Sequence, residues 1–246
     1  MLWRRLLSLL ALLALAVISL QLYFLARIAL MSLVDPASTS FQRSEAARLA
    51  LTPGLRWRWR QEWVDLDRLP TSVMRAVLAS EDAGFVEHSG VEWEAIEKAW
   101  QRNRQAEERA ERAARTHPAR ARPARLRGGS TVTQQLAKNL LLSGERTLAR
   151  KGQELLLTWM LEALLSKRRI LEIYLNHVEW GEGVFGVQAA AQHYFGIDAT
   201  RLSAEQAARL AVMLPAPKRF EKRPQSAYVL ERAATILARM PAVAVP

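Results

Sequence analysis

Cysteine is absent from this chain of 246 residues, which excludes disulfide bonds and metal sites built on thiolates. Histidine is scarce, and the spacing of His117, His177 and His193 matches no metal-binding motif. Acidic residues are outnumbered, since 24 Asp and Glu stand against 35 Lys and Arg and leave a formal charge of +11. Such a charge suits an anionic partner, whether a phosphate, a nucleic acid or a lipid surface.

Charged residues are also missing between residues 6 and 26, a run long enough to cross a bilayer of about 30 Å as a helix. Arg4 and Arg5 precede this run and favour a cytoplasmic N-terminus with the remainder exported, although Arg27 on the far side weakens that orientation. Residues 14–16 resemble a signal-peptidase site, but the apolar run continues for about ten residues beyond them. We therefore expect an uncleaved single transmembrane helix rather than a cleaved signal peptide.

The rest of the chain divides around this anchor. Apolar residues persist to residue 34 and can lie on the membrane surface, so the anchor is assigned to residues 1–34. A polar linker is expected at residues 35–50, and residues 51–246 suffice for one domain with its own core. Arginine dominates residues 101–127, where we expect a mobile basic loop whose first half can extend the preceding helix. Nucleic acid and anionic lipid headgroups are the alternative partners of such a stretch.

Apolar periodicity predicts helices over most of the domain, so the fold class is mainly α. Helices are expected at residues 187–195, 203–214 and 226–240. Ser203 and Gln206 form a capping box for the second of them. Alternating Trp and Arg at residues 55–60 predict a short strand with its tryptophans on one side. Glu154 is expected to be partly buried and paired with Arg150, one turn earlier.

Residues 128–139 (Gly-Gly-Ser-Thr-Val-Thr-Gln-Gln-Leu-Ala-Lys-Asn) carry the clearest sign of a binding site. Apolar residues recur at every fourth position, namely Val132, Leu136 and Leu140. Polar residues repeat at the same spacing on roughly the opposite helix face, namely Ser130, Gln134 and Lys138. A glycine-rich helix start attracts anions, and an ammonium group adds a positive charge. The pattern predicts a site for a phosphate and hydroxyl-rich groups, with a solvated polar face as the alternative.

An acidic pair marks the end of an earlier helix. This helix is expected to begin after Pro70, with Thr71 or Ser72 as its N-cap, and to end near Glu81 and Asp82. Its buried face is formed by Val73, Met74, Val77 and Leu78. A helix end beside a glycine turn lets a carboxylate project into a cleft. Surface solvation of the pair is the alternative.

Four blocks, in this order, resemble one family. They are residues 81–90 (Glu-Asp-Ala-Gly-Phe-Val-Glu-His-Ser-Gly), 128–139, 150–154 (Arg-Lys-Gly-Gln-Glu) and 170–176 (Ile-Leu-Glu-Ile-Tyr-Leu-Asn). They are similar to the peptidoglycan glycosyltransferases of family 51 and to the glycosyltransferase half of class A penicillin-binding proteins. The resemblance covers roughly residues 55–220. Neither Ser-x-x-Lys nor Lys-Thr-Gly occurs, so a transpeptidase domain is not expected and the monofunctional members are the nearest relatives.

The resemblance implies a lysozyme-like helical fold in two lobes with a cleft between them, and it assigns roles. Glu81 falls on the position of the catalytic base, while Lys138 and Arg146 match the cations that bind the diphosphate of the donor. Glu154 matches a second glutamate, which holds a divalent metal such as Mg²⁺ or Mn²⁺ or orients basic side chains. The blocks also contain further residues expected to bind substrate or to shape the site around Glu81, namely Ser130, Gln134, Asn139, Arg150, Lys151, Asp82 and His88.

The implied reaction is inverting glycosyl transfer. Lipid II, a polyprenyl-diphosphate disaccharide-pentapeptide, is polymerised into β-1,4 glycan strands outside the cytoplasmic membrane of a bacterium, with release of the diphosphate lipid. Expected partners are lipid II, the nascent glycan strand, the membrane and other cell-wall or division proteins, but no nucleic acid. Two alternatives remain: a lysozyme-like hydrolase or lytic transglycosylase, and a membrane-tethered basic module that binds nucleic acid or lipid.

Overall fold

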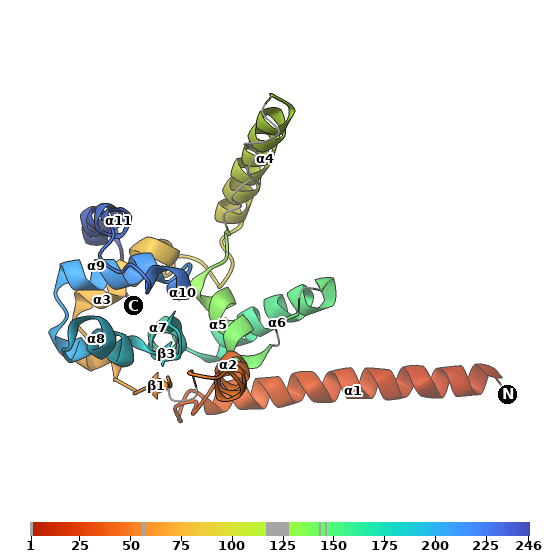
Figure 1. Ribbon diagram of the computed structural model, residues 1–246. Helices are drawn as coiled ribbons and strands as arrows, with labels where there is room; N and C mark the ends of the chain where they lie inside the picture. Colours follow the sequence, from red (N-terminus) through yellow and green to blue (C-terminus); the bar gives the residue numbers. More distant parts are fainter. Residues whose placement is uncertain (1, 56–57, 117–127, 143, 146) are drawn as a thin grey trace.

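The computed structural model describes residues 2–55, 58–116, 128–142, 144–145 and 147–246 (Figure 1). The α-helices are α1 (Leu2–Leu30), α2 (Ser40–Leu51), α3 (Thr71–Glu81), α4 (Trp93–Thr116), α5 (Val132–Leu141), α6 (Leu148–Leu164), α7 (Lys167–His177), α8 (Val187–Phe195), α9 (Ala204–Met213), α10 (Pro217–Phe220) and α11 (Ala227–Arg239). Short 3₁₀ turns are η1 (Leu66–Arg68), η3 (Ala199–Arg201) and η4 (Met240–Ala242), and the strands are β1 (Arg60–Gln61), β2 (Glu179–Gly181) and β3 (Val184–Phe185). The expectation of a mainly α fold is confirmed.

Helix α1 projects from the domain with most of its length uncovered (Figure 1). Residues Trp3–Leu30 are long and apolar enough to cross a membrane, which makes the helix longer than the span expected at 6–26. Its last turns belong to the domain instead, because Phe24 and Ile28 are buried in the core. Gln21 exchanges two side-chain hydrogen bonds of 2.9 Å with Gln153 of α6. The anchor therefore joins the domain through packing as well as through the chain.

The segment expected as a polar linker contains helix α2, so this interpretation of residues 35–50 is wrong over most of its length. Thr39 and Gln42 form a reciprocal capping box at the start of the helix, and both are fully buried. Leu49 is buried near its end, and α2 packs against α5. The apolar residues of α2 are spread around the helix and form no single face, so apolar periodicity does not mark this helix in the sequence.

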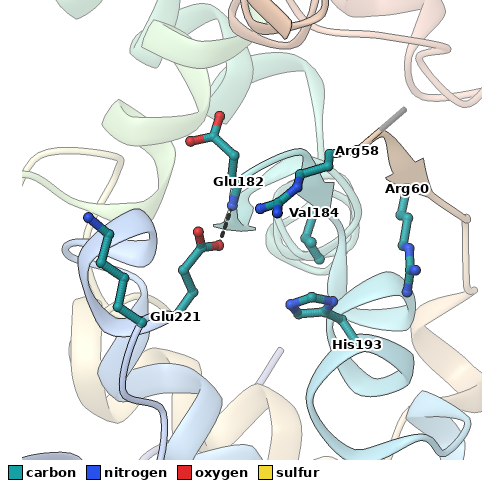
Figure 2. Close-up of a pocket in the computed structure, with 7 residues that line it drawn as sticks. Arg58, Arg60, Glu182, Val184, His193 and Glu221 are labelled. Atoms are coloured by element: carbon teal, nitrogen blue, oxygen red, sulfur yellow. Dashed lines mark hydrogen bonds between the residues drawn. The ribbon is translucent and has the colours of Figure 1, made fainter. Parts of the chain in front are cut away.

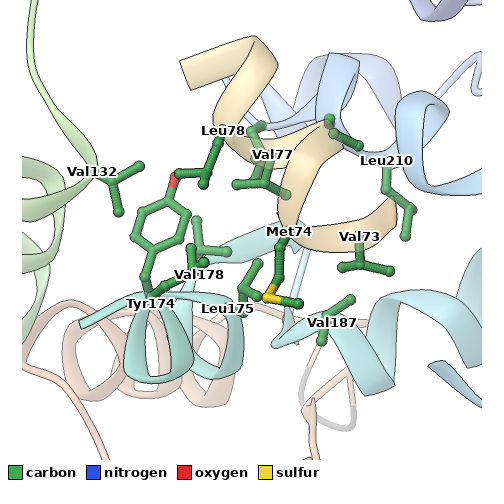
Figure 3. Packing of buried hydrophobic residues seen from close by; sticks show 14 of the residues in the cluster. Val73, Met74, Val77, Leu78, Val132, Tyr174, Leu175, Val178, Val187 and Leu210 are labelled. Atoms are coloured by element: carbon green, nitrogen blue, oxygen red, sulfur yellow. The ribbon is translucent and has the colours of Figure 1, made fainter. Parts of the chain in front are cut away.

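The core lies between two groups of helices that face each other across α7 (Figure 1). One group holds α3, α9 and α11, which pack on one another; the other holds α2, α5 and α6 beside α1. Val73, Val77 and Leu78 of α3 are buried as predicted and meet Leu175 and Tyr174 of α7 in the same apolar cluster (Figure 3). Pro70, rather than Thr71 or Ser72, occupies the N-cap of α3 and makes no side-chain cap.

A small sheet of order β1-β3-β2 closes one edge of the domain, with β1 parallel and β2 antiparallel to β3. The strand predicted at 55–60 is shorter, since only its last residue is in β1, and residues 56–57 lie outside the described part of the chain. Trp59 packs its ring on Phe185, with centroids 4.7 Å apart. Gly183, in the β2–β3 turn, has a φ of +73° and lies against the backbone of Arg58, where a side chain would not fit.

Helix α4 stands out from the body of the domain (Figure 1). The preceding helix extends into the first half of the basic stretch, as expected, since α4 continues to Thr116; residues 117–127 lie outside the described part, and the mobile loop expected there stays a prediction. Ala, Arg and Glu are strong helix formers, and Glu94 pairs with Lys98 one turn away at 2.9 Å. The other expected helices, at 187–195, 203–214 and 226–240, are present within a residue of their predicted ends.

Candidate active site

Glu81 is the last residue of α3 and faces the start of α5. Its Oε2 accepts a hydrogen bond of 3.0 Å from Nε2 of Gln135, and the Ser80 hydroxyl donates to its Oε1 at 3.3 Å. Burial raises the pKa of Glu81, the two hydrogen bonds oppose that rise, and the charge of Asp82 adds to it. A carboxylate with a raised pKa beside a cavity has the properties of a general base.

The sequence pattern did not indicate Gln135 as a site residue, because the repeat of polar residues at every fourth position selects the neighbouring Gln134. The Tyr174 hydroxyl donates to Oε1 of Gln135 at 3.0 Å, which directs the amide NH₂ toward Glu81. Tyr174 is fully buried in α7. Gln135 belongs to the recognised block, but only the packing of α5 on α3 and α7 reveals that it points at the carboxylate.

Gln134 lines neither of the two cavities beside Glu81 that are described below, and its predicted contact with substrate stays a prediction. It is buried and forms a capping box with Thr131 at the start of α5, accepting from the backbone N–H of Thr131 at 3.1 Å. Val132, Leu136 and Leu140 are fully buried, as predicted for the apolar face. The predicted polar face is therefore divided: Ser130 precedes the helix, Gln134 caps it and Lys138 is exposed.

Asp82 and His88 hold the site together from behind Glu81. Asp82 is buried; its Oδ2 accepts from the backbone N–H of Val132 at 2.9 Å, and its Oδ1 lies 2.8 Å from Nε2 of His88. The Gly90 N–H donates a hydrogen bond of 3.1 Å to Nδ1 of His88. Nε2 therefore carries the ring proton and donates the hydrogen bond to Asp82. Both side chains therefore shape the site around Glu81, and their polar atoms are directed at protein groups rather than at a substrate.

A cavity of about 150 Å³ opens on one side of Glu81. It is lined by Glu81, Asp82, Glu92, Ala95, Ala99, Arg102 and residues 128–131. Ser130 is exposed there, as its predicted role requires. Gly129 lies against α4 so closely that a Cβ would come within 3.0 Å of the Ala95 carbonyl. The glycine pair thus lets the loop before α5 approach α4 and form the wall of this cavity.

A larger cavity of about 600 Å³ opens on the other side, lined by Gln135, Lys138, Asn139, Arg150 and Glu179 among others. Although much of its side chain is exposed, desolvation at the cavity wall lowers the pKa of Lys138; the charge of Glu154 opposes this effect, and Arg150 and Lys151 add to it. Three cations thus converge on one carboxylate at this end of the cavity. A bound diphosphate would relieve their mutual repulsion. Arg146 lies outside the described residues.

Glu154 is 4 % exposed, and each of its oxygens is paired with a cation. Arg150 Nη1 lies 2.9 Å from Oε2, and Lys151 Nζ donates to Oε1. The pair with Arg150 is the one the sequence predicts. Among the described residues, Glu154 belongs to no group of three or more side chains that could hold a metal ion. The arrangement fits a residue that orients basic side chains and does not fit a divalent metal held by the protein at Glu154.

Asp82, His88 and Glu92 bring three possible ligand atoms within 4.8 Å of one another. Both ring nitrogens of His88 are already hydrogen-bonded, however, and so are both oxygens of Asp82. A metal would have to displace the contacts that join α3 to α5. The described residues therefore give this cluster a structural role.

The far wall of the larger cavity carries an ionic network that sequence reasoning missed. Lys218 approaches Glu45 at 2.5 Å and Glu179 at 3.3 Å, and Arg48 pairs with Glu45 and Glu182. Burial raises the pKa of Glu179 to about 7, with Lys218 opposing the rise and Glu45 adding to it. These residues come from α2, β2, the β2–β3 turn and α10, so only the tertiary fold brings them together.

The fold and the site define a class of protein: the profile of the transglycosylase family matches residues 50–241, and the chain belongs to that family of lysozyme-like helical enzymes. Its curated relatives span most of its length. A biosynthetic peptidoglycan transglycosylase of Burkholderia thailandensis is 51% identical over 227 residues, which are 92% of this chain and 82% of that protein. Proteins of the same name from Cupriavidus metallidurans (49%; 94% of each chain) and Bordetella pertussis (49%; 86% and 82%) are similar.

Proposed function

We propose that this protein polymerises lipid II into β-1,4 glycan strands by inverting glycosyl transfer. The observation that carries the proposal is the position of Glu81. Its carboxylate lines the smaller cavity and accepts a hydrogen bond from Gln135, which lines the larger cavity together with the cations Lys138 and Arg150. A base and a cationic wall thus lie at two neighbouring cavities that meet at Gln135.

Glu81 is assigned as the general base. The 4-hydroxyl of the acceptor enters from the smaller cavity and transfers its proton to Glu81 as it attacks the anomeric carbon of the donor. The Ser80 and Gln135 contacts leave the carboxylate fixed in direction. Inversion follows from a single displacement, in which the base and the leaving group lie on opposite faces of the sugar.

The leaving group is a diphosphate, which needs charge stabilisation more than protonation. Lys138 and Arg150 line the cavity that we assign to it, and Asn139 supplies an amide beside them. Glu154 acts through Arg150 and Lys151 by holding their cationic groups in place. The contribution of Arg146 stays a prediction from the resemblance.

The two alternatives account for less of the molecule. A hydrolase that cleaves the same polymer would use Glu81 but would have no role for a cationic wall that includes Lys138. A basic binding module for nucleic acid or lipid would use the cations and would leave Glu81 and its orienting partners without a role. The curated relatives are named for biosynthesis, which favours the synthetic direction.

The catalytic domain is proposed to lie outside the cytoplasmic membrane, with α1 as a single-pass anchor. The apolar surface of α1 and its junction with α6 support this arrangement. A lipid-linked substrate would then reach the cleft from the membrane in which its own lipid is embedded.

The direction of the reaction is tested by giving the purified, detergent-solubilised protein two substrates in parallel: labelled lipid II and preformed glycan strands. The proposal expects muramidase-sensitive polymer from lipid II and no cleavage of the preformed strands. Cleavage of the strands without polymer formation would support the hydrolase, and neither reaction from a folded protein would overturn the assignment of a synthase.

A further inference from the structure

A third cavity, of about 340 Å³, lies beside the small sheet and is not part of the cleft that contains Glu81. Figure 2 shows its lining: Arg58 and Arg60 at the β1 edge, Val184 of β3 at the floor, and His193 of α8 facing them. Glu182, Glu221 and Lys222 complete the wall. Three separate segments of the chain thus bring basic groups to one hollow.

The arginines of this cavity have no structural task in the described part of the chain. Neither Arg58 nor Arg60 makes a side-chain hydrogen bond or ion pair with another described residue, although 14 such ion pairs are found elsewhere. The positive charge is felt locally, because both arginines help burial to lower the pKa of His193. Guanidinium groups that line a cavity without a hydrogen bond or ion pair of their own are available to an anion.

The two carboxylates of the cavity are already engaged. Glu182 pairs with Arg48 of α2, and Oε2 of Glu221 accepts from the Glu182 backbone N–H at 2.5 Å, as the dashed line in Figure 2 marks. Burial raises the pKa of Glu221, and the nearby charges of Arg58, Lys218 and Lys222 oppose that rise. The cavity therefore presents a net positive surface built around Arg58 and Arg60.

The cavity borders the larger substrate cavity through a shared wall. Glu182 lines the basic cavity, and its carboxylate belongs to the ionic network of Glu45, Glu179 and Lys218, in which Glu45 and Glu179 line the substrate cavity. A substrate in the larger cavity is thus one layer of side chains away from the two arginines.

We propose that this basic cavity binds the C-terminal carboxylate of the peptide carried by the donor strand. The inference rests on the proposed function, which places the donor in the neighbouring cavity. Apart from its diphosphate, which the Lys138 end of the cleft accommodates, the anionic groups of this substrate are carboxylates of the peptide. Arg58 and Arg60 offer planar, bidentate donors that match a carboxylate.

A lipid headgroup is the alternative occupant, since β1 and β3 lie near the C-terminal end of α1, where the chain enters the domain (Figure 1). The wall that this cavity shares with the larger substrate cavity favours a group of the substrate instead. A peptide that hangs from a sugar in the cleft can reach the cavity from the side where the two cavities meet.

The test uses the full chain in detergent and two forms of lipid II, one with a free peptide C-terminus and one with the C-terminal carboxamide. For the wild type we expect a KM for the amide form that is roughly three- to tenfold higher, because the charged partner of the arginines is lost. In the double variant Arg58→Gln/Arg60→Gln the KM ratio of the two substrates falls to about one.

A matched control removes the same charge elsewhere. Arg232 and Arg239 are exposed residues of α11 that line none of the three cavities, so Arg232→Gln/Arg239→Gln keeps the wild-type ratio. Polymerisation by the wild type with a ratio of one, or a ratio that persists in the Arg58→Gln/Arg60→Gln variant, would overturn this inference while leaving the proposed function intact. Absence of polymer from both substrates would instead overturn the proposed function.

Discussion

At the scale of single residues, the behaviour of Glu81 follows from a balance between burial and hydrogen bonds. Burial raises its pKa and thereby strengthens it as a base, while Gln135 and Ser80 favour the charged form that must accept the proton. Gln135 is in turn oriented by Tyr174, whose hydroxyl reaches its amide oxygen. A chain of three hydrogen-bonded side chains, from α3, α5 and α7, therefore fixes the orientation of the Glu81 carboxylate.

Replacing Gln135 by leucine removes a hydrogen bond that stabilises the carboxylate, so the pKa of Glu81 rises further. Activity requires the deprotonated base, and the acidic limb of the kcat/KM profile should therefore move to higher pH in Gln135→Leu. Gln192→Leu, at an exposed position of α8, should leave the limb in place. An acidic limb that stays unmoved in Gln135→Leu would show that Glu81 does not control it.

The residue scale also shows what a sequence can reveal about the site. The block around Glu81 and the block that contains Lys138 were sufficient to indicate the candidate base and a candidate cation, which the structure places at two neighbouring cavities. They were insufficient to separate Gln134 from Gln135, because adjacent helix positions differ by about 100° and only the packed neighbours decide which one faces the carboxylate. Glu179 carried no local signal, since its partners are distant in the chain.

At the scale of elements, Asp82 joins the end of α3 to the start of α5. Removing it in Asp82→Ala leaves the Val132 N–H and His88 without their buried acceptor, and we expect a loss of about 3 kcal/mol in unfolding free energy. Thermal unfolding of the detergent-solubilised protein measures this loss. Asp67→Ala, which breaks an exposed ion pair with Arg168, should cost less than about 1 kcal/mol. Equal stability of the two variants would contradict the role given to Asp82.

The network between α2, β2 and α10 makes stability depend on pH. Because the pKa of Glu179 is raised from 4.5 to about 7, its contribution is fully present below pH 4.5 and is lost as the pH rises through about 7. In Glu179→Gln this dependence is removed, so the variant should gain stability relative to the wild type between pH 4.5 and 7.

Denaturation of both proteins at several pH values checks this expectation. Glu231→Gln, at an exposed position of α11, serves as the control and should show no such relative gain. A difference between Glu179→Gln and wild type that does not change with pH would refute the titration of Glu179.

Element prediction succeeded where the signal is local and failed where it is not. The capping box of Ser203 and Gln206 marked α9 correctly. An equivalent box of Thr39 and Gln42 starts α2, yet the apolar residues that follow it form no single face. The burial that stabilises α2 comes from α5 and from the contact of Phe41 with Phe185 of β3. The helix continues in α4 because alanine and charged helix formers need no buried face to remain helical.

At the scale of the whole molecule, one basic chain combines the apolar helix α1, a cleft that contains Glu81 and the cations Lys138 and Arg150, and the basic cavity of Arg58 and Arg60. The positive charge, read from composition alone, was compatible with nucleic acid, lipid or phosphate as partner. In the structure, this positive charge lies in separate places. Lys138, Arg150 and Lys151 lie around Glu154, whereas Arg58 and Arg60 line the basic cavity beside the small sheet. Composition could give the sign of the charge but not these separate locations.

The central claim is that Glu81 is the base of a polymerising glycosyltransferase, and the most direct test is the rate of glycan formation from labelled lipid II by Glu81→Gln. Glu87→Gln, an exposed glutamate of the same block, is the matched control. We expect Glu81→Gln to lose activity by roughly 10²- to 10⁴-fold, as removal of a general base does, with Glu87→Gln close to wild type. Comparable rates for the two folded variants would contradict the account.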